Sequence, residues 1–165
     1  MNGGGETQMA RLDFKGLDVY LDQLSKLEQS TTGLIKRALY DGAAVLADAV
    51  RSEVQMIPTT DRNTEPQAVF EYEKDGLLNS LGIAKMKEKN GYIYTRVDFD
   101  GYNRMKSNKY PQGHPNSMIA RAINSGTSKR PKNPFMDRAV KKAKAPAQNA
   151  MKARFDADLN DIMKG

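Results

Sequence analysis

Cysteine and tryptophan are absent from this 165-residue sequence, and histidine occurs once, at position 114. Without cysteine the chain can form no disulfide and no thiolate site, and a single imidazole excludes a multi-histidine metal site. The longest apolar runs fall far short of the roughly 20 residues that a membrane-spanning helix needs. The sequence therefore predicts no metal, no cofactor and no contact with a membrane.

Catalytic groups are also sparse. His114 lies between Gly113 and Pro115 in a polar segment, where a histidine is more typical of a loop than of an active site. The glycines at positions 3–5 precede neither a strand nor a Lys-Ser/Thr pair, so they form no phosphate-binding loop. Asp98 and Asp100 alternate along a strand edge, where a metal pair is possible but nothing else in the sequence supports it. We expect no enzymatic activity, and a hydrolase is the weakest of the alternatives.

Positive and negative charges are unevenly distributed along the chain, and acidic residues are scarce in residues 128–154. The formal net charge is +6, yet residues 1–57 carry a net charge of −2 and residues 128–154 carry +8. A basic region of this kind suits contact with nucleic acid or with an acidic protein surface. It equally suits a lysine-rich helix face in water, and composition leaves both interpretations open.

The N-terminal half is dominated by one long helix. Residues 1–10 are glycine-rich and predict a flexible arm, residues 11–15 alternate like a strand, and residues 17–27 show helical spacing. The strongest helical periodicity covers residues 31–56, and Pro58 ends it. We interpret this helix as a core element packed on a sheet, although its small residues, such as Gly42, also permit a self-association face.

The middle of the chain predicts strands. Residues 59–67 are polar and indicate an exposed loop, and residues 68–72 alternate weakly, as in a strand or a lid. Asn90-Gly91 is a hairpin signal that joins strands over 82–88 and 92–100. The predicted class is therefore α+β, with a small antiparallel sheet packed against the long N-terminal-half helix and a C-terminal helix.

Residues 101–115 form a polar connection that is unusually long for a compact domain. It interleaves Tyr102, Arg104 and Tyr110 with lysines, a combination on which nucleic-acid bases can stack. No signature of a known nucleic-acid module accompanies it. The alternative function is a small basic nucleic-acid-binding module that uses the basic C-terminal part of the chain.

Two helices are predicted after this connection. Ser117 is placed to cap a helix over 118–125, which Gly126 would end with a positive φ. Asn133 is placed to cap the last helix, with Pro134 as its first residue.

Pro146 is expected to end or kink that last helix near Ala145. We accordingly predict a single α+β domain over residues 11–145 and a helical extension over 146–165. The extension carries an apolar stripe that includes Phe155 and needs a partner surface.

Residues 120–139 read A-R-x-x-x-x-G-T-S-x-x-P-x-x-P-F-M-x-x-A. Two further pieces precede this segment: an alanine-rich helix ending in Ile57-Pro58, and the step Gly76-Leu77-Leu78-Asn79-Ser80-Leu81. In this order they resemble the phage tail completion proteins, the small head–tail joining or tail terminator proteins of long-tailed phages. The resemblance covers roughly residues 12–145.

This resemblance implies a structural virion protein, assembled in the host cytoplasm, that forms a ring, commonly a hexamer. Such a ring terminates the tail tube, which is built from the major tail tube protein, and joins it to the head connector or stopper. The resemblance leaves open whether the ring also contacts packaged DNA. The residues that carry the signature are Gly126, Thr127, Pro134 and Phe135. The residues that we expect at a subunit or partner interface are Arg130, Lys132, Tyr102, Arg104, Tyr110 and Phe155. Replacing Arg130 and Lys132 by glutamate is expected to spare folding and to impair the joining of heads to tails.

Overall fold

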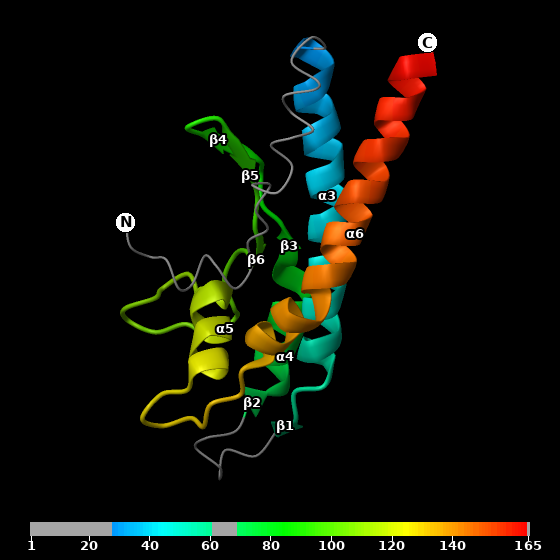
Figure 1. Ribbon diagram of the computed structural model, residues 1–165. Coiled ribbons are helices and arrows are strands. Elements are labelled where there is room, and N and C mark those ends of the chain that lie inside the picture. The colour runs from blue at the N-terminus through cyan, green and yellow to red at the C-terminus, as the bar shows by residue number, and fades with distance from the viewer. Residues whose placement is uncertain (1–27, 61–68, 165) are drawn as a thin grey trace. The chain divides into compact units, whose positions relative to one another are not determined.

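A computed structural model of the chain describes residues 28–60 and 69–164, which fall into two compact units. Unit 1 comprises residues 28–46, 83–97 and 142–164 of the described chain, and unit 2 comprises residues 47–60, 69–82 and 98–141. The predicted arm over 1–10, strand over 11–15 and helix over 17–27 lie outside the described residues, as does most of the predicted loop over 59–67. The described part has the predicted α+β class, with a small antiparallel sheet packed against long helices (Figure 1).

Ten elements make up the described chain. The helices are α3 (Glu28–Gln55), α4 (Glu71–Ser80), α5 (Asn116–Ser125) and α6 (Phe135–Lys164). The strands are β1 (Thr59–Thr60), β2 (Val69–Phe70), β3 (Leu81–Ile83), β4 (Lys87–Lys89), β5 (Tyr92–Tyr94) and β6 (Val97–Phe99). The long helices α3 and α6 each contribute to both units, whereas α4 and α5 belong to unit 2.

In unit 1, the first part of α3 and the last part of α6 run antiparallel, side by side (Figure 1). Their contact buries Leu34, Ile35, Ala38, Leu39, Met151 and Phe155. Gly42 permits this approach, because a Cβ atom there would lie only 2.5 Å from Cγ of Met151. The interpretation of the long helix as a core element is therefore confirmed.

The hairpin of unit 1 confirms the Asn-Gly signal. Strands β4 and β5 pair antiparallel, and Asn90 and Gly91 between them have φ values of 53° and 82°. Met86 and Ile93 pack against the α3–α6 cluster, which places the small sheet on the long helices.

The predicted strands over 82–88 and 92–100 are shorter than expected and are interrupted. The hydroxyl of Thr95 donates to the carbonyl of Ala84, so a side chain replaces a ladder hydrogen bond at that point. The result is two short strand pairs, β4–β5 and β3–β6, instead of one continuous hairpin.

In unit 2, α4 packs against α5, and β1 and β2 pair in parallel beside α4. The ring of Phe99 meets that of Phe135 edge to face, with 6.2 Å between centroids. Phe135 is fully buried, as its position at the start of an apolar face predicts. The other large buried apolar residues of this unit are Val50, Val54, Ile57, Val69, Leu77, Ile119 and Ile123.

Two predicted boundaries are wrong by a few residues. Within the described part of the segment 68–72, the strand is confined to Val69–Phe70, because α4 begins at Glu71 and the carboxylate of Glu73 accepts the N–H of Phe70. Helix α5 begins at Asn116 rather than 118, and the carbonyl of Pro115 accepts its first backbone hydrogen bonds. Ser117 therefore lies inside the helix and does not cap it.

The expected end of the last helix at Ala145 is also wrong. Helix α6 continues through Pro146 to Lys164. Pro146 itself is exposed, while Ala147, Met151 and Phe155 form a buried stripe beyond it. Burial of this stripe compensates for the one backbone hydrogen bond that proline removes. The boundary predicted between residues 145 and 146 falls inside α6.

No helix among the described residues is both long and apolar enough to cross a membrane.

Candidate functional site

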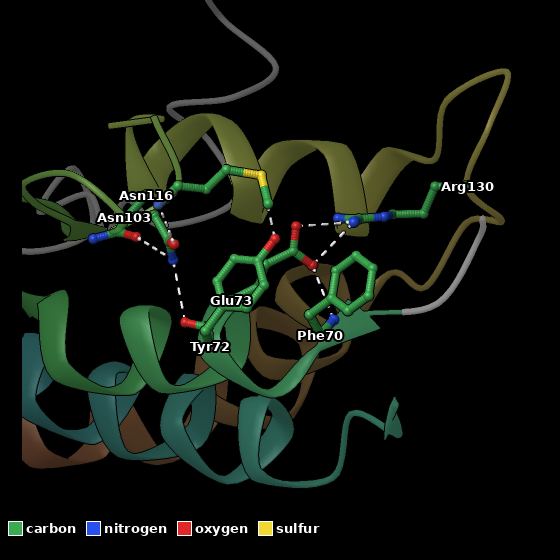
Figure 2. A network of polar contacts seen from close by, with 7 residues as sticks. Phe70, Tyr72, Glu73, Asn103, Asn116 and Arg130 are labelled. Carbon is green, nitrogen blue, oxygen red and sulfur yellow. Dashed lines mark hydrogen bonds and ion pairs between the residues drawn. The ribbon is translucent and has the colours of Figure 1, made fainter. Parts of the chain in front are cut away.

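The first turn of α4 holds both of the loops in which interface residues were predicted. Tyr72 contacts the connection over residues 101–115, and Glu73 contacts the loop over residues 126–134 (Figure 2). Both loops and α4 belong to unit 2. Two consecutive residues of α4 therefore contact two loops that lie far apart from α4 and from each other in the sequence.

Glu73 and Arg130 form a largely buried ion pair. Nη2 of Arg130 donates to both carboxylate oxygens of Glu73 at 3.0 Å, and the two side chains are 16% and 10% exposed, respectively. One carboxylate oxygen also accepts the N–H of Phe70 at 3.1 Å. Arg130 therefore anchors its loop from the inside, and glutamate at this position would face Glu73. We therefore no longer expect Arg130→Glu to spare folding, because it would place two carboxylates together in a largely buried site.

Gly126 ends α5 as predicted, with a φ of 76° and a ψ of 164°. This region of backbone space belongs essentially to glycine. A Cβ atom here would also lie 2.9 Å from the backbone nitrogen of Lys132. The loop after it is closed by reciprocal backbone hydrogen bonds between Thr127 and Arg130, and Oγ1 of Thr127 accepts the N–H of Lys129.

Asn103 organises the connection over residues 101–115. Its backbone N–H donates to the carbonyl of His114 at 2.7 Å. Its buried side chain donates to the carbonyl of Tyr72 at 3.2 Å and to Oδ1 of Asn116 at 3.5 Å. A Cβ atom on Gly113 would collide with the carbonyl oxygen of Asn103. These contacts of Asn103 hold the two ends of the connection together. The length of the connection alone did not predict this.

Tyr72 supports the exposed side of the same connection. Its ring stacks on that of Phe70 at 5.5 Å, and the guanidinium of Arg104 lies 5.1 Å from its centroid. Its hydroxyl donates to Sδ of Met105 at 3.3 Å. Burial raises the pKa of Tyr72, and the charge of Glu73 raises it further, against the opposing effect of Arg130 and Arg104. The hydroxyl therefore keeps its proton and remains a donor.

The other predicted interface residues are divided between surface and core. Tyr102, Arg104 and Lys132 are exposed, and Tyr110 is half-buried with its ring 4.9 Å from that of His114. Phe155 is 1% exposed in the α3–α6 cluster of unit 1. Its ring therefore serves the core of that unit instead of its surface.

The start of α6 is capped by a residue that the sequence did not single out. Oδ1 of Asn124, at the end of α5, accepts the N–H groups of Met136 and Asp137 at 2.9 and 3.4 Å. Asn133, the predicted cap, instead accepts a hydrogen bond from Arg138. Pro134 precedes the helix, and its carbonyl accepts the N–H of Arg138.

Sequence spacing could have revealed one of these roles. Glutamate three residues after Phe70 matches the second half of a capping box, which is the bond that Glu73 makes. No local pattern pointed to Tyr72, Asn103 or Asn124, because their partners lie in distant segments.

A cavity of about 290 Å³ lies among these elements of unit 2. Its lining comes from α4, from the end of the connection at His114, from α5 and from the loop after Gly126: Glu73, His114, Met118, Ile119, Ala122, Thr127, Lys129 and Arg130. Within residues 28–60 and 69–164, no group of three or more histidine or carboxylate side chains could hold a metal ion.

Comparison with known proteins identifies no relative: no family model, no curated protein and no solved structure matches this chain.

Proposed function

We propose that this protein is a structural subunit of the head–tail joint of a long-tailed phage. In this proposal it forms a ring, commonly of six copies, that terminates the tail tube and joins it to the head connector or stopper. The resemblance of residues 120–139 to the tail completion proteins supports it. The family is expected to use loops for contacts between neighbouring copies, since a closed ring needs two different, complementary surfaces on each subunit.

The observation that carries the proposal is the anchoring of both loops on α4. Hydrogen bonds to Tyr72 and Glu73 hold the bases of the loops, while Tyr102, Arg104 and Lys132 stay exposed. A loop that is held before assembly loses little conformational entropy when it meets a neighbour. Aromatic and arginine side chains are also the types that most often carry binding energy in interfaces.

The first experiment measures the mass of the purified full chain by light scattering across concentration, with and without isolated tail tubes. A ring of about six copies, formed alone or only on tubes, is the expected result. A mass that stays monomeric under both conditions would contradict the proposal.

A charge-reversal variant tests the exposed loops. Arg104→Glu combined with Lys132→Glu is expected to leave the thermal stability almost unchanged, because both side chains are exposed. It should lower the yield of joined heads and tails in an assembly assay. A matched control is Lys87→Glu with Lys89→Glu on strand β4, whose residues are also exposed. Equal yields from both variants would show that these loops do not take part in the joint.

A small nucleic-acid-binding module is the second candidate. It is favoured by the exposed ring of Tyr102, on which an unpaired base could stack, and by the exposed Arg104 in the same connection. It predicts that the monomer binds single-stranded DNA with an affinity that falls steeply as salt rises. The ring proposal predicts weak DNA binding by the monomer, so one salt titration separates the two.

A further inference from the structure

We propose that the cavity beside Glu73 and Arg130 binds a carboxylate that is carried next to an aliphatic group, as at the C-terminus of a polypeptide that ends in leucine. The inference concerns unit 2 alone and does not depend on ring formation.

The charges around the cavity favour a single negative charge on the ligand. The carboxylate of Glu73 is already compensated, since Arg130 donates to both of its oxygens (Figure 2). Lys129 lines the same cavity and forms no ion pair with any residue of the described segments. The lining therefore carries one cation in excess, which suits a monoanion.

Other polar residues complete the lining. Thr127 and His114 both line the cavity. Arginine has five N–H donors, and the pair with Glu73 engages only those of Nη2. A carboxylate could therefore receive a hydrogen bond in addition to the attraction of Lys129.

Part of the cavity wall is apolar. Met118, Ile119 and Ala122 lie on one side of α5 and line the cavity together. A volume of about 290 Å³ is at the lower limit of known ligand pockets, which run from roughly 300 to 1,000 Å³. It fits one aliphatic side chain with its carboxylate.

A phosphate group fits these charges less well. It carries a charge of about −1.5 to −2 at neutral pH, which exceeds the single positive charge that the lining carries in excess. Phosphate therefore serves as a discriminating comparison rather than as an alternative ligand.

The test uses the full chain and the ring protons of His114, which are simple to follow by NMR because the chain has one histidine. N-acetyl-leucine is the probe, and the uncharged N-acetyl-leucinamide and inorganic phosphate are the comparisons. Saturable shifts of the His114 signals with N-acetyl-leucine, at least threefold stronger in affinity than with either comparison, are the expected result. No saturable shift, or equal affinity for the amide or for phosphate, would overturn the proposal.

Two variants locate the binding. Lys129→Gln should weaken binding about threefold, as expected for loss of an exposed ion pair, whereas Lys132→Gln, in the same loop but outside the cavity lining, should bind like the parent chain. Ala122→Phe should fill the cavity and abolish the shifts, with circular dichroism confirming that it folds. If Lys129→Gln and Lys132→Gln bind alike, the assignment of the cation is wrong, even where Ala122→Phe does not fold.

Discussion

The guanidinium of Arg130 donates to both carboxylate oxygens of Glu73, 57 residues earlier in the chain, at 3.0 Å. The pair joins the loop after α5 to the first turn of α4, and Glu73 at the same time accepts the N–H of Phe70. One carboxylate thus starts a helix and holds a distant loop. The resulting frame supports both the proposed partner surface and the cavity.

Arg130→Ala should destabilise the protein by about 3 kcal/mol, because it leaves the buried carboxylate of Glu73 without its cation. Urea unfolding of the variant and its parent measures the difference. Lys132→Ala is the control, since its exposed side chain should change the free energy of unfolding by no more than about 0.5 kcal/mol. Equal effects of the two substitutions would show that the ion pair contributes little.

Asn124→Ala should cost about 1–2 kcal/mol, because the N–H groups of Met136 and Asp137 lose their acceptor at the start of α6. Asn133→Ala should cost less, since the side chain of Asn133 accepts its hydrogen bond from the exposed side chain of Arg138 and caps no N–H of α6. Thermal unfolding of both variants gives the order of the two effects. A larger effect of Asn133→Ala would show that Asn133, and not Asn124, caps α6.

Gly126→Ala should destabilise the protein by roughly 1–3 kcal/mol, because the backbone there has a positive φ and a Cβ atom would crowd the nitrogen of Lys132. Gly82→Ala is the matched control: its φ is not positive, and a Cβ atom there meets nothing within 4 Å. Denaturant midpoints report the difference. A harmless Gly126→Ala would mean that the loop can rearrange.

Asp158→Asn tests a surface network of unit 1. The hydrogen bond from Arg37 at 2.7 Å lowers the pKa of Asp158, and Arg154 adds a second hydrogen bond. A folded-state pKa below the unfolded one contributes stability above the unfolded value, about 3.9. That contribution is lost as the pH falls through the folded value.

The melting temperature of Asp158→Asn should therefore lie below that of the parent at pH 7, and the difference should shrink below about pH 4. Asp161→Asn is the control: because its position on the same helix is exposed, it should change the melting temperature little at pH 7. A difference that stays constant from pH 7 to pH 3 would exclude this titration as its source.

Local patterns determined several features of this fold. The apolar periodicity of residues 31–56 identified α3, Asn90-Gly91 identified the hairpin turn, and Gly126 identified the end of α5. Each of these features depends on residue spacing within one segment or on the backbone freedom of one residue, so it can be predicted from the local sequence.

Tertiary contacts decided the rest. Helix α6 runs through Pro146 because the buried stripe at Ala147, Met151 and Phe155 outweighs one missing hydrogen bond. Arg130 looks like a free cation in the sequence, but burial beside Glu73 turns it into an anchor. Asn103 and Asn124 gain their roles from partners in other elements. Desolvation and hydrogen bonding between distant segments depend on which side chains the fold brings together, and no local pattern contains that information.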